Sequence, residues 1–134
     1  QGSRFTRDRD RMGIVLRELR RRGMFFLDSR TSGGSIGAEL AQEMGLPHAA
    51  RDVFLDHDPS RREIRERMRE AEALALSTGR AVVIAHPRTA TMDMVEPWLA
   101  ALSRDGIRLV PVASVLTRPQ PAPPKRLAHN QATE

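Results

Sequence analysis

The stretch that decides the fold is Arg51-Asp52-Val53-Phe54-Leu55-Asp56-His57-Asp58, in which three apolar residues are followed at once by two acids and a histidine. A short apolar run that ends in polar groups is typical of a buried strand with functional side chains at its carboxyl end. Similar runs occupy 24–27, 81–85 and 108–112. The four runs begin at steps of 29, 28 and 27 residues. Steps of this length fit a strand plus a crossover helix, so the sequence predicts an α/β fold of repeating βα units with a parallel sheet.

Helical periodicity fills the intervals between these runs, in apolar stripes that include Leu16, Leu40, Met68 and Leu99. The first stripe has no strand before it. Because a helix follows a strand in a βα repeat, we expect at least one strand to precede this chain. From 117 onward the sequence is polar and rich in proline. It therefore predicts one domain over 1–116 and a disordered tail over 117–134.

The composition excludes several classes of protein. With 134 residues and no Cys, the chain has room for one domain with a real core but has no disulfide and no thiolate metal site. No apolar run approaches the roughly 20 residues of a membrane span. The 22 basic residues mostly alternate with the 17 acidic ones along the predicted helices, and Tyr is absent. This pattern favours a salt-bridged surface over a nucleic-acid interface.

Polar residues follow each predicted strand, and the carboxyl ends of parallel strands share one rim. Asp28, Arg30, Asp56, His86 and Ser114 are therefore expected at one edge of the sheet. Such a set suits acid/base chemistry, with His86 as proton donor or acceptor and a carboxylate that orients it. The alternative is that the acids only cap helices and close turns. We prefer that alternative for Asp58, and the functional interpretation for the residues directly after the strands.

Together these motifs resemble the divergent polysaccharide deacetylase family. The matching segments occur in that family's order and spacing: Gly2-Ser3-Arg4-Phe5-Thr6, Phe26-Leu27-Asp28-Ser29-Arg30-Thr31, Arg51 to Asp56, Ile84-Ala85-His86-Pro87 with Thr91, and Gly106-Ile107 to Leu109-Val110-Pro111-Val112-Ala113-Ser114. The resemblance covers residues 2 to about 116.

The resemblance implies the later part of a distorted (β/α) barrel of seven strands. It implies a bacterial periplasmic or envelope hydrolase of carbohydrate metabolism that removes acetyl groups from N-acetylated glycans with the help of a divalent metal, Zn²⁺ being the expected ion. By the same resemblance His86 is the general acid. Asp28, Arg30 and Asp56 position the substrate or the catalytic base. Ser29, Thr31 and Ser114 are the candidate substrate-binding residues.

The sequence also departs from the family pattern. The family's first strand carries an Asp-Asp pair, and a metal-type His precedes the segment that matches Gly2 to Thr6; neither is in the printed sequence. We therefore expect the metal and the activity in the full-length protein, and neither in this chain alone. A non-catalytic envelope protein that binds glycans or other proteins is the alternative. Missing early strands would leave an open sheet edge beside Phe25 and Phe26, which predicts self-association.

Overall fold

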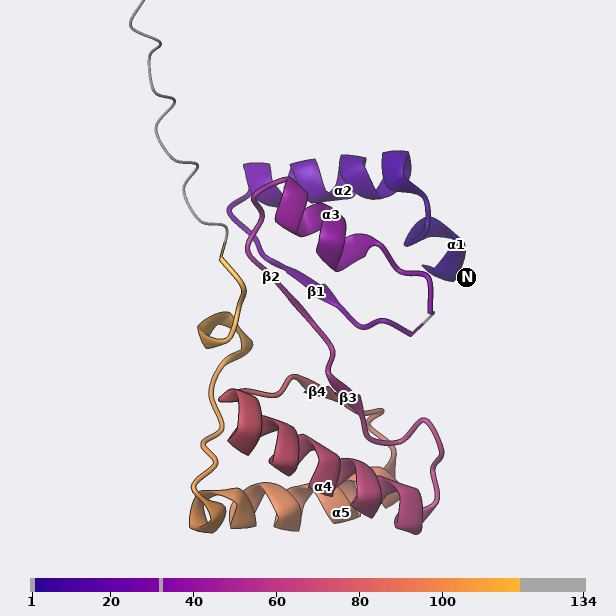
Figure 1. The fold of residues 1–134 in the computed structure, drawn as a ribbon. Coiled ribbons are helices and arrows are strands. Elements are labelled where there is room, and N and C mark those ends of the chain that lie inside the picture. Colours follow the sequence, from indigo (N-terminus) through magenta and orange to yellow (C-terminus); the bar gives the residue numbers. More distant parts are fainter. Residues whose placement is uncertain (1, 32, 119–134) are drawn as a thin grey trace, which may run out of the picture.

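The computed structural model describes residues 2–31 and 33–118, in which helices and short strands alternate (Figure 1). The strands are β1 (Phe26–Asp28), β2 (His48–Ala50), β3 (Val53–Phe54) and β4 (Val83–Ile84). The helices are α1 (Gly2–Phe5), α2 (Arg9–Arg21), α3 (Gly37–Glu43), α4 (Arg61–Thr78) and α5 (Thr89–Ala101), with 3₁₀ helices η1 (Leu102–Asp105) and η2 (Val112–Ser114).

Both strand pairs are parallel, which confirms the predicted α/β fold with parallel strands, but they form two two-stranded sheets in place of the single predicted sheet. β1 pairs with β2, with Asp28 opposite Ala50, and β3 pairs with β4, with Phe54 opposite Ile84. β2 was not predicted, because His48-Ala49-Ala50 lacks the branched or aromatic residues that mark strands. Only Arg51 and Asp52 separate β2 from β3, so one length of chain serves both pairs (Figure 1).

The prediction of a strand over 108–112 is wrong. This segment is irregular, and η2 begins at Val112. Pro111 has no N–H to donate to a ladder, and Leu109 is 60% exposed instead of packed in a sheet. The chain then runs back along the molecule to Thr117, whose N–H and carbonyl exchange hydrogen bonds with His48 (Figure 1). Residues 119–134 of the predicted tail lie outside the described residues.

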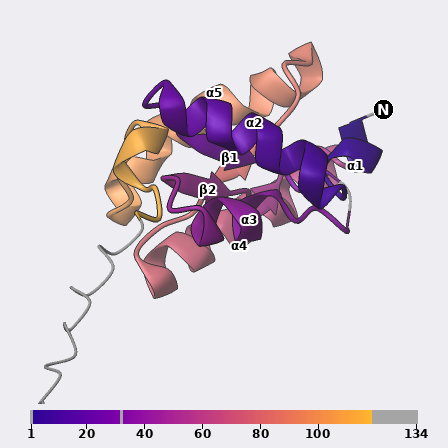
Figure 2. The ribbon, with the colours of Figure 1, turned by 90° about the horizontal axis from the view of Figure 1, so that it is seen from above.

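Two apolar clusters form the core. In one, α2 and α3 lie side by side over β1 and β2 (Figures 1 and 2); its buried residues are Met12, Leu16, Leu40, Ala41 and Leu46. In the other, α4 and α5 pack together against β3 and β4; its buried residues are Val53, Leu55, Ile64, Met68, Ala71, Met94 and Val95. The strands that precede the predicted site residues therefore pack against different clusters, β1 against one and β3 and β4 against the other.

The outer faces of the helices carry ion pairs, as the alternation of basic and acidic residues predicts. Glu18 accepts from Arg21 and Arg22 on α2, and Arg67 pairs with Glu70 on α4. These pairs are exposed and contribute little stability each. No helix within 2–31 or 33–118 is long and apolar enough to cross a membrane.

Gly37 offers a test of the packing of α3 on β1. A Cβ at Gly37 would lie 2.7 Å from Phe26 Cε1 and 3.1 Å from Asp28 Oδ2. We expect Gly37→Ala to lower the free energy of unfolding by about 1–3 kcal/mol, measured by urea denaturation, because the close contact forces neighbouring groups to shift. Gly33→Ala is the control: a Cβ there would meet nothing within 4 Å. Equal effects of the two substitutions would contradict this packing.

The outer edge of β1 offers a test of self-association. β1 pairs with β2 on one side and, among the described residues, with no strand on the other. Phe25 is 40% exposed near this edge, and its neighbours Met24 and Leu27 are 51% and 38% exposed. Phe26 was also expected at the open edge, but it packs against the cluster between α2 and α3. We expect the sedimentation coefficient to rise with protein concentration, and Phe25→Lys to suppress the rise. Leu76→Lys, at an apolar residue on α4 that is 63% exposed and so more exposed than Phe25, should not. A monomer at every concentration would contradict self-association through the outer edge of β1.

Candidate functional site

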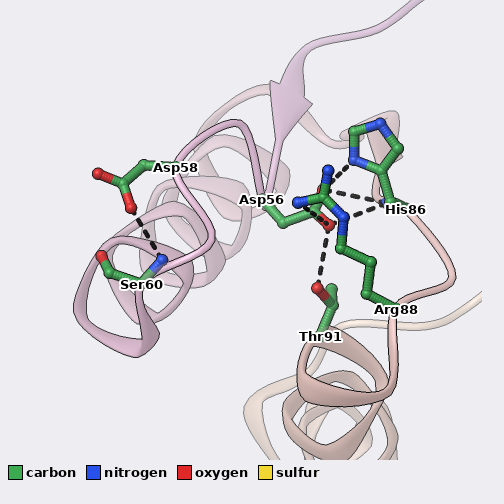
Figure 3. A network of polar contacts seen from close by, with 6 residues as sticks. All are labelled: Asp56, Asp58, Ser60, His86, Arg88 and Thr91. Atoms are coloured by element: carbon green, nitrogen blue, oxygen red, sulfur yellow. Dashed lines mark hydrogen bonds and ion pairs between the residues drawn. The ribbon is translucent and has the colours of Figure 1, made fainter.

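Asp56 and His86 meet where two adjacent parallel strands end. Each lies two residues beyond its strand, and the strands pair Phe54 with Ile84, so the register brings the two side by side. His86 Nδ1 lies 3.1 Å from Asp56 Oδ1. The His86 backbone N–H donates to both carboxylate oxygens, at 3.0 Å and 3.2 Å (Figure 3).

The first turn of α5 completes the shell around this carboxylate. The Thr91 hydroxyl donates to Asp56 Oδ2 at 2.9 Å. Arg88 Nη1 lies 3.9 Å from the same oxygen, from a half-exposed side chain. Asp56 itself is 0% exposed. A fully buried carboxylate is thus surrounded by donors from β4's end and from α5 (Figure 3).

The charge on Asp56 follows from these contacts. Burial raises the pKa of the Asp56 carboxyl, because the charged form loses its hydration. The hydrogen bonds from the His86 N–H, the Thr91 hydroxyl and the His86 ring, with the attraction of a charged His86, outweigh burial and lower the pKa below its ordinary value. Asp56 is therefore an ionised acceptor near neutral pH. Because an ionised carboxylate only accepts, Nδ1 of His86 must be the donor.

The His86 ring is held at its other side by an aromatic contact. It lies 5.2 Å from the Phe54 ring, at 46°. Its side chain is 48% exposed, and its second nitrogen, Nε2, points away from Asp56 (Figure 3). With Nδ1 committed to Asp56, Nε2 is the atom at which the ring can take or give a proton.

Asp28 has a different set of partners. Its Oδ1 accepts from Arg30 N–H at 2.9 Å, and its Oδ2 accepts from Ser35 Oγ at 2.8 Å and Ala38 N–H at 3.1 Å. Ala38 lies in the first turn of α3, where a negative charge complements the helix dipole. The buried carboxylate thus closes the turn after β1, and none of its hydrogen-bond partners belongs to the Asp56 group. Its predicted catalytic role stays a prediction.

The Arg51 side chain contacts both the turn after β1 and the Phe54 ring, which lies against the His86 ring. Its guanidinium donates to the Ser29 carbonyl at 2.6 Å and the Arg30 carbonyl at 2.7 Å, and lies 5.5 Å from the Phe54 centroid. Arg30 has φ = 47°, in the left-handed region, and its backbone is held from both ends by Asp28 and Arg51. The side chains of Ser29, Arg30 and Thr31 are exposed.

Three further predicted residues lie apart from the pair. Ser114 is exposed at the end of η2 and lines an apolar cavity of about 860 Å³ whose described lining contains neither Asp56 nor His86. His57 is exposed, with its ring 5.8 Å from that of Phe54. Asp58 was interpreted as the cap of α4, but Ser60 is the cap; Asp58 instead accepts from the Ser60 N–H, which lowers the pKa of Asp58 (Figure 3).

The residues present do not make a metal site by themselves. In 2–31 and 33–118, no three His, Asp or Glu side chains are grouped so that they could hold an ion. Both oxygens of Asp56 already accept hydrogen bonds, and Nδ1 of His86 is bonded to one of them.

Sequence reasoning did not identify Thr91 or Arg51 as contributors to the site. Thr91 appeared in the sequence only as part of the motif that includes His86, with no contact assigned to it. A hydroxyl in the first helical turn after a functional strand end is a usable signal, because that turn faces the rim. Arg51 precedes its strand, and nothing in its spacing points to a loop more than 20 residues earlier.

Comparison with known proteins identifies a family and two relatives. A model of the divergent polysaccharide deacetylase family matches residues 1–116. An uncharacterized protein of Haemophilus influenzae is 32% identical over 124 residues, and the uncharacterized protein YibQ of Escherichia coli is 35% identical over 127 residues. Each match covers 92% of this chain but only 44% and 40% of those proteins, so the chain spans less than half the length of these relatives.

A solved structure has the same fold. The crystal structure of an uncharacterized protein from Agrobacterium tumefaciens matches with a TM-score of 0.79 and 25% sequence identity. The match covers 84% of this chain and 46% of that one.

The charge of Asp56 predicts how stability depends on pH. Its pKa in the folded chain lies below the ordinary value of 3.8. The ionised carboxylate therefore stabilises the fold above that pH, and this contribution is lost as the pH falls through the folded pKa. We expect urea denaturation to show a free energy of unfolding that decreases with acidification below about pH 4, and a flatter dependence for Asp56→Asn.

Asp58→Asn is the matched control. The pKa of Asp58 is also lowered, by the Ser60 N–H, but Asp58 is exposed, so solvent screens its charge. Asp58→Asn should therefore change the pH dependence of the free energy of unfolding less than Asp56→Asn does. Parallel pH curves for the parent chain and Asp56→Asn would show that the buried carboxylate does not carry this dependence.

Proposed function

Because the chain belongs to the divergent polysaccharide deacetylase family, we propose that it forms the later part of a barrel-type hydrolase domain that removes acetyl groups from N-acetylated glycans. The substrate would be a polysaccharide or peptidoglycan-type glycan of the bacterial envelope, and the activity would belong to the full-length protein. Support comes from the family match together with the acid–histidine pair at the strand ends.

The observation that carries this proposal is the bond between the buried Asp56 carboxylate and Nδ1 of His86, 3.1 Å apart. It places the exchangeable proton of His86 at Nε2, on a half-exposed ring. In hydrolysis of an N-acetyl group, water oxygen bonds to the acetyl carbon and the C–N bond breaks. Protonated Nε2 donates to the leaving nitrogen, which departs as a free amine, with acetate as the other product. Asp56 stabilises the charged imidazolium and keeps its orientation.

The loop after β1 is assigned to substrate positioning. The side chains of Ser29, Arg30 and Thr31 are exposed. Hydrogen bonds to the Arg30 N–H and carbonyl fix the backbone position from which the Arg30 side chain extends. Asp28 supports this loop through three hydrogen bonds and, by resemblance, also belongs to the catalytic group. Ser114 is assigned to substrate binding on the same resemblance.

The divalent metal implied by the resemblance, Zn²⁺ being the expected ion, would polarise the acetyl carbonyl and activate water. A catalytic zinc site takes about three protein ligands, which the described residues do not supply together. The proposal therefore assigns this metal to the full-length protein.

A second candidate is a non-catalytic envelope domain that binds glycans or other proteins. The contacts of Asp56 favour it in one respect. Its carboxylate is closed off from solvent and accepts from a backbone N–H and a buried hydroxyl, which is also how structural carboxylates are held. The two candidates differ in whether His86 moves a proton.

His86→Ala in the full-length protein tests this difference. We expect the rate of release of acetate from an N-acetylated glycan to fall by about 10²–10⁴, with the far-UV circular dichroism unchanged. His57→Ala is the control, because His57 also contacts Phe54 but has no bond to Asp56. If His86→Ala releases acetate as fast as the parent protein, the general-acid assignment is wrong. If the parent protein releases no acetate but binds the glycan, the second candidate is correct.

A further inference from the structure

Thr91 occupies an unusual place for a helix residue. It lies in the first turn of α5, is 1% exposed, and its hydroxyl bonds Asp56 Oδ2 at 2.9 Å. Threonine in such a position usually serves its own helix, but α5 has no side-chain cap. The hydroxyl instead donates its proton to the carboxylate of Asp56, which follows β3 (Figure 3).

The two oxygens of Asp56 are divided between two partners. Oδ1 faces Nδ1 of His86 and Oδ2 accepts from Thr91. The His86 backbone N–H does not distinguish them, since it lies 3.0 Å from one and 3.2 Å from the other. A shared donor of this kind leaves the carboxylate free to turn about its Cβ–Cγ bond. A second donor on one oxygen removes that freedom.

Arg88 does not replace Thr91 in this function. Its guanidinium is 3.9 Å from Oδ2, beyond hydrogen-bonding distance, and its side chain is half exposed. Thr91 is therefore the buried side-chain donor that holds the plane of the Asp56 carboxylate in place. With a carboxylate oxygen held against the ring, a neutral imidazole carries its proton on Nδ1 and its lone pair on Nε2.

We propose that Thr91 is a positioning residue for His86: its hydroxyl fixes the Asp56 carboxylate, and the carboxylate fixes the tautomer and orientation of the imidazole. Thr91 does not touch substrate; it acts through Asp56. This inference deepens the proposed function and rests on it for its catalytic consequence, whereas the tautomer itself is a property of this chain and can be measured without catalysis.

The experiment is ¹⁵N NMR of the imidazole nitrogens in the 134-residue chain, at a pH where the ring is neutral. We expect the parent chain to hold the proton of His86 on Nδ1. Thr91→Val keeps the shape and removes the hydroxyl. It should lower the ratio of the Nδ1–H to the Nε2–H tautomer by about tenfold, equivalent to about 1.4 kcal/mol. Thr91→Ser keeps a hydroxyl and should restore the parent spectrum.

Thr89→Val is the matched control, because it removes an exposed hydroxyl from the same helical turn. It should leave the His86 tautomer unchanged. A folded Thr91→Val chain with the parent tautomer would overturn the proposal. A folded Thr91→Ser chain that has lost the parent tautomer of His86 would also overturn it. This second outcome remains decisive if Thr91→Val does not fold.

Kinetics in the full-length protein separate this proposal from the proposed function. For a positioning residue, Thr91→Val should lower kcat with KM near the parent value, and Thr91→Ser should recover it. If the tautomer changes as expected but the parent protein has no deacetylase activity, positioning stands and the proposed function fails. If the parent is active and Thr91→Val alters neither kcat nor the tautomer, the positioning role is overturned.

Discussion

The buried charge of Asp56 is the constraint on which the site depends. Removing a carboxylate from water is costly unless donors replace the lost hydration. Here the donors are the His86 N–H, the His86 ring and the Thr91 hydroxyl. They come from the end of β4 and the start of α5, so satisfying one charge at the end of β3 holds three elements together. The same contacts that stabilise the fold therefore orient the imidazole.

The junction between β2 and β3 decides how the two halves of the molecule are joined. Arg51 N–H donates to the Asp28 carbonyl at 2.8 Å, while the Asp52 carboxylate accepts from the Val82 N–H at 2.7 Å. Within two residues the chain changes partner from β1 to β4. The guanidinium of Arg51 then holds the loop after β1 and covers Phe54. Movement of that loop would therefore displace Arg51 and with it the Phe54 ring, which contacts His86.

The rim residues divide into two kinds of carboxylate. Asp28 closes a turn and complements the first turn of α3, whereas Asp56 carries a titratable partner on an exposed ring. The contacts therefore distinguish a carboxylate that holds a loop from one that orients an imidazole.

The sequence by itself determined the α/β class, the parallel direction of the strands and the helices α2 to α5, because apolar periodicity and the 27- to 29-residue steps are local properties of the chain. It also placed Asp56 and His86 at strand ends. It did not reveal β2, the irregular path of 108–112 or the contact between Thr91 and Asp56. Strand formation depends on a partner, which His48 finds in both Phe26 and Thr117 and which Leu109 lacks among the described residues. Only the tertiary structure decided which donors surround the Asp56 carboxylate, because hydrogen bonds between residues 30 or more positions apart follow from packing and register rather than from local sequence.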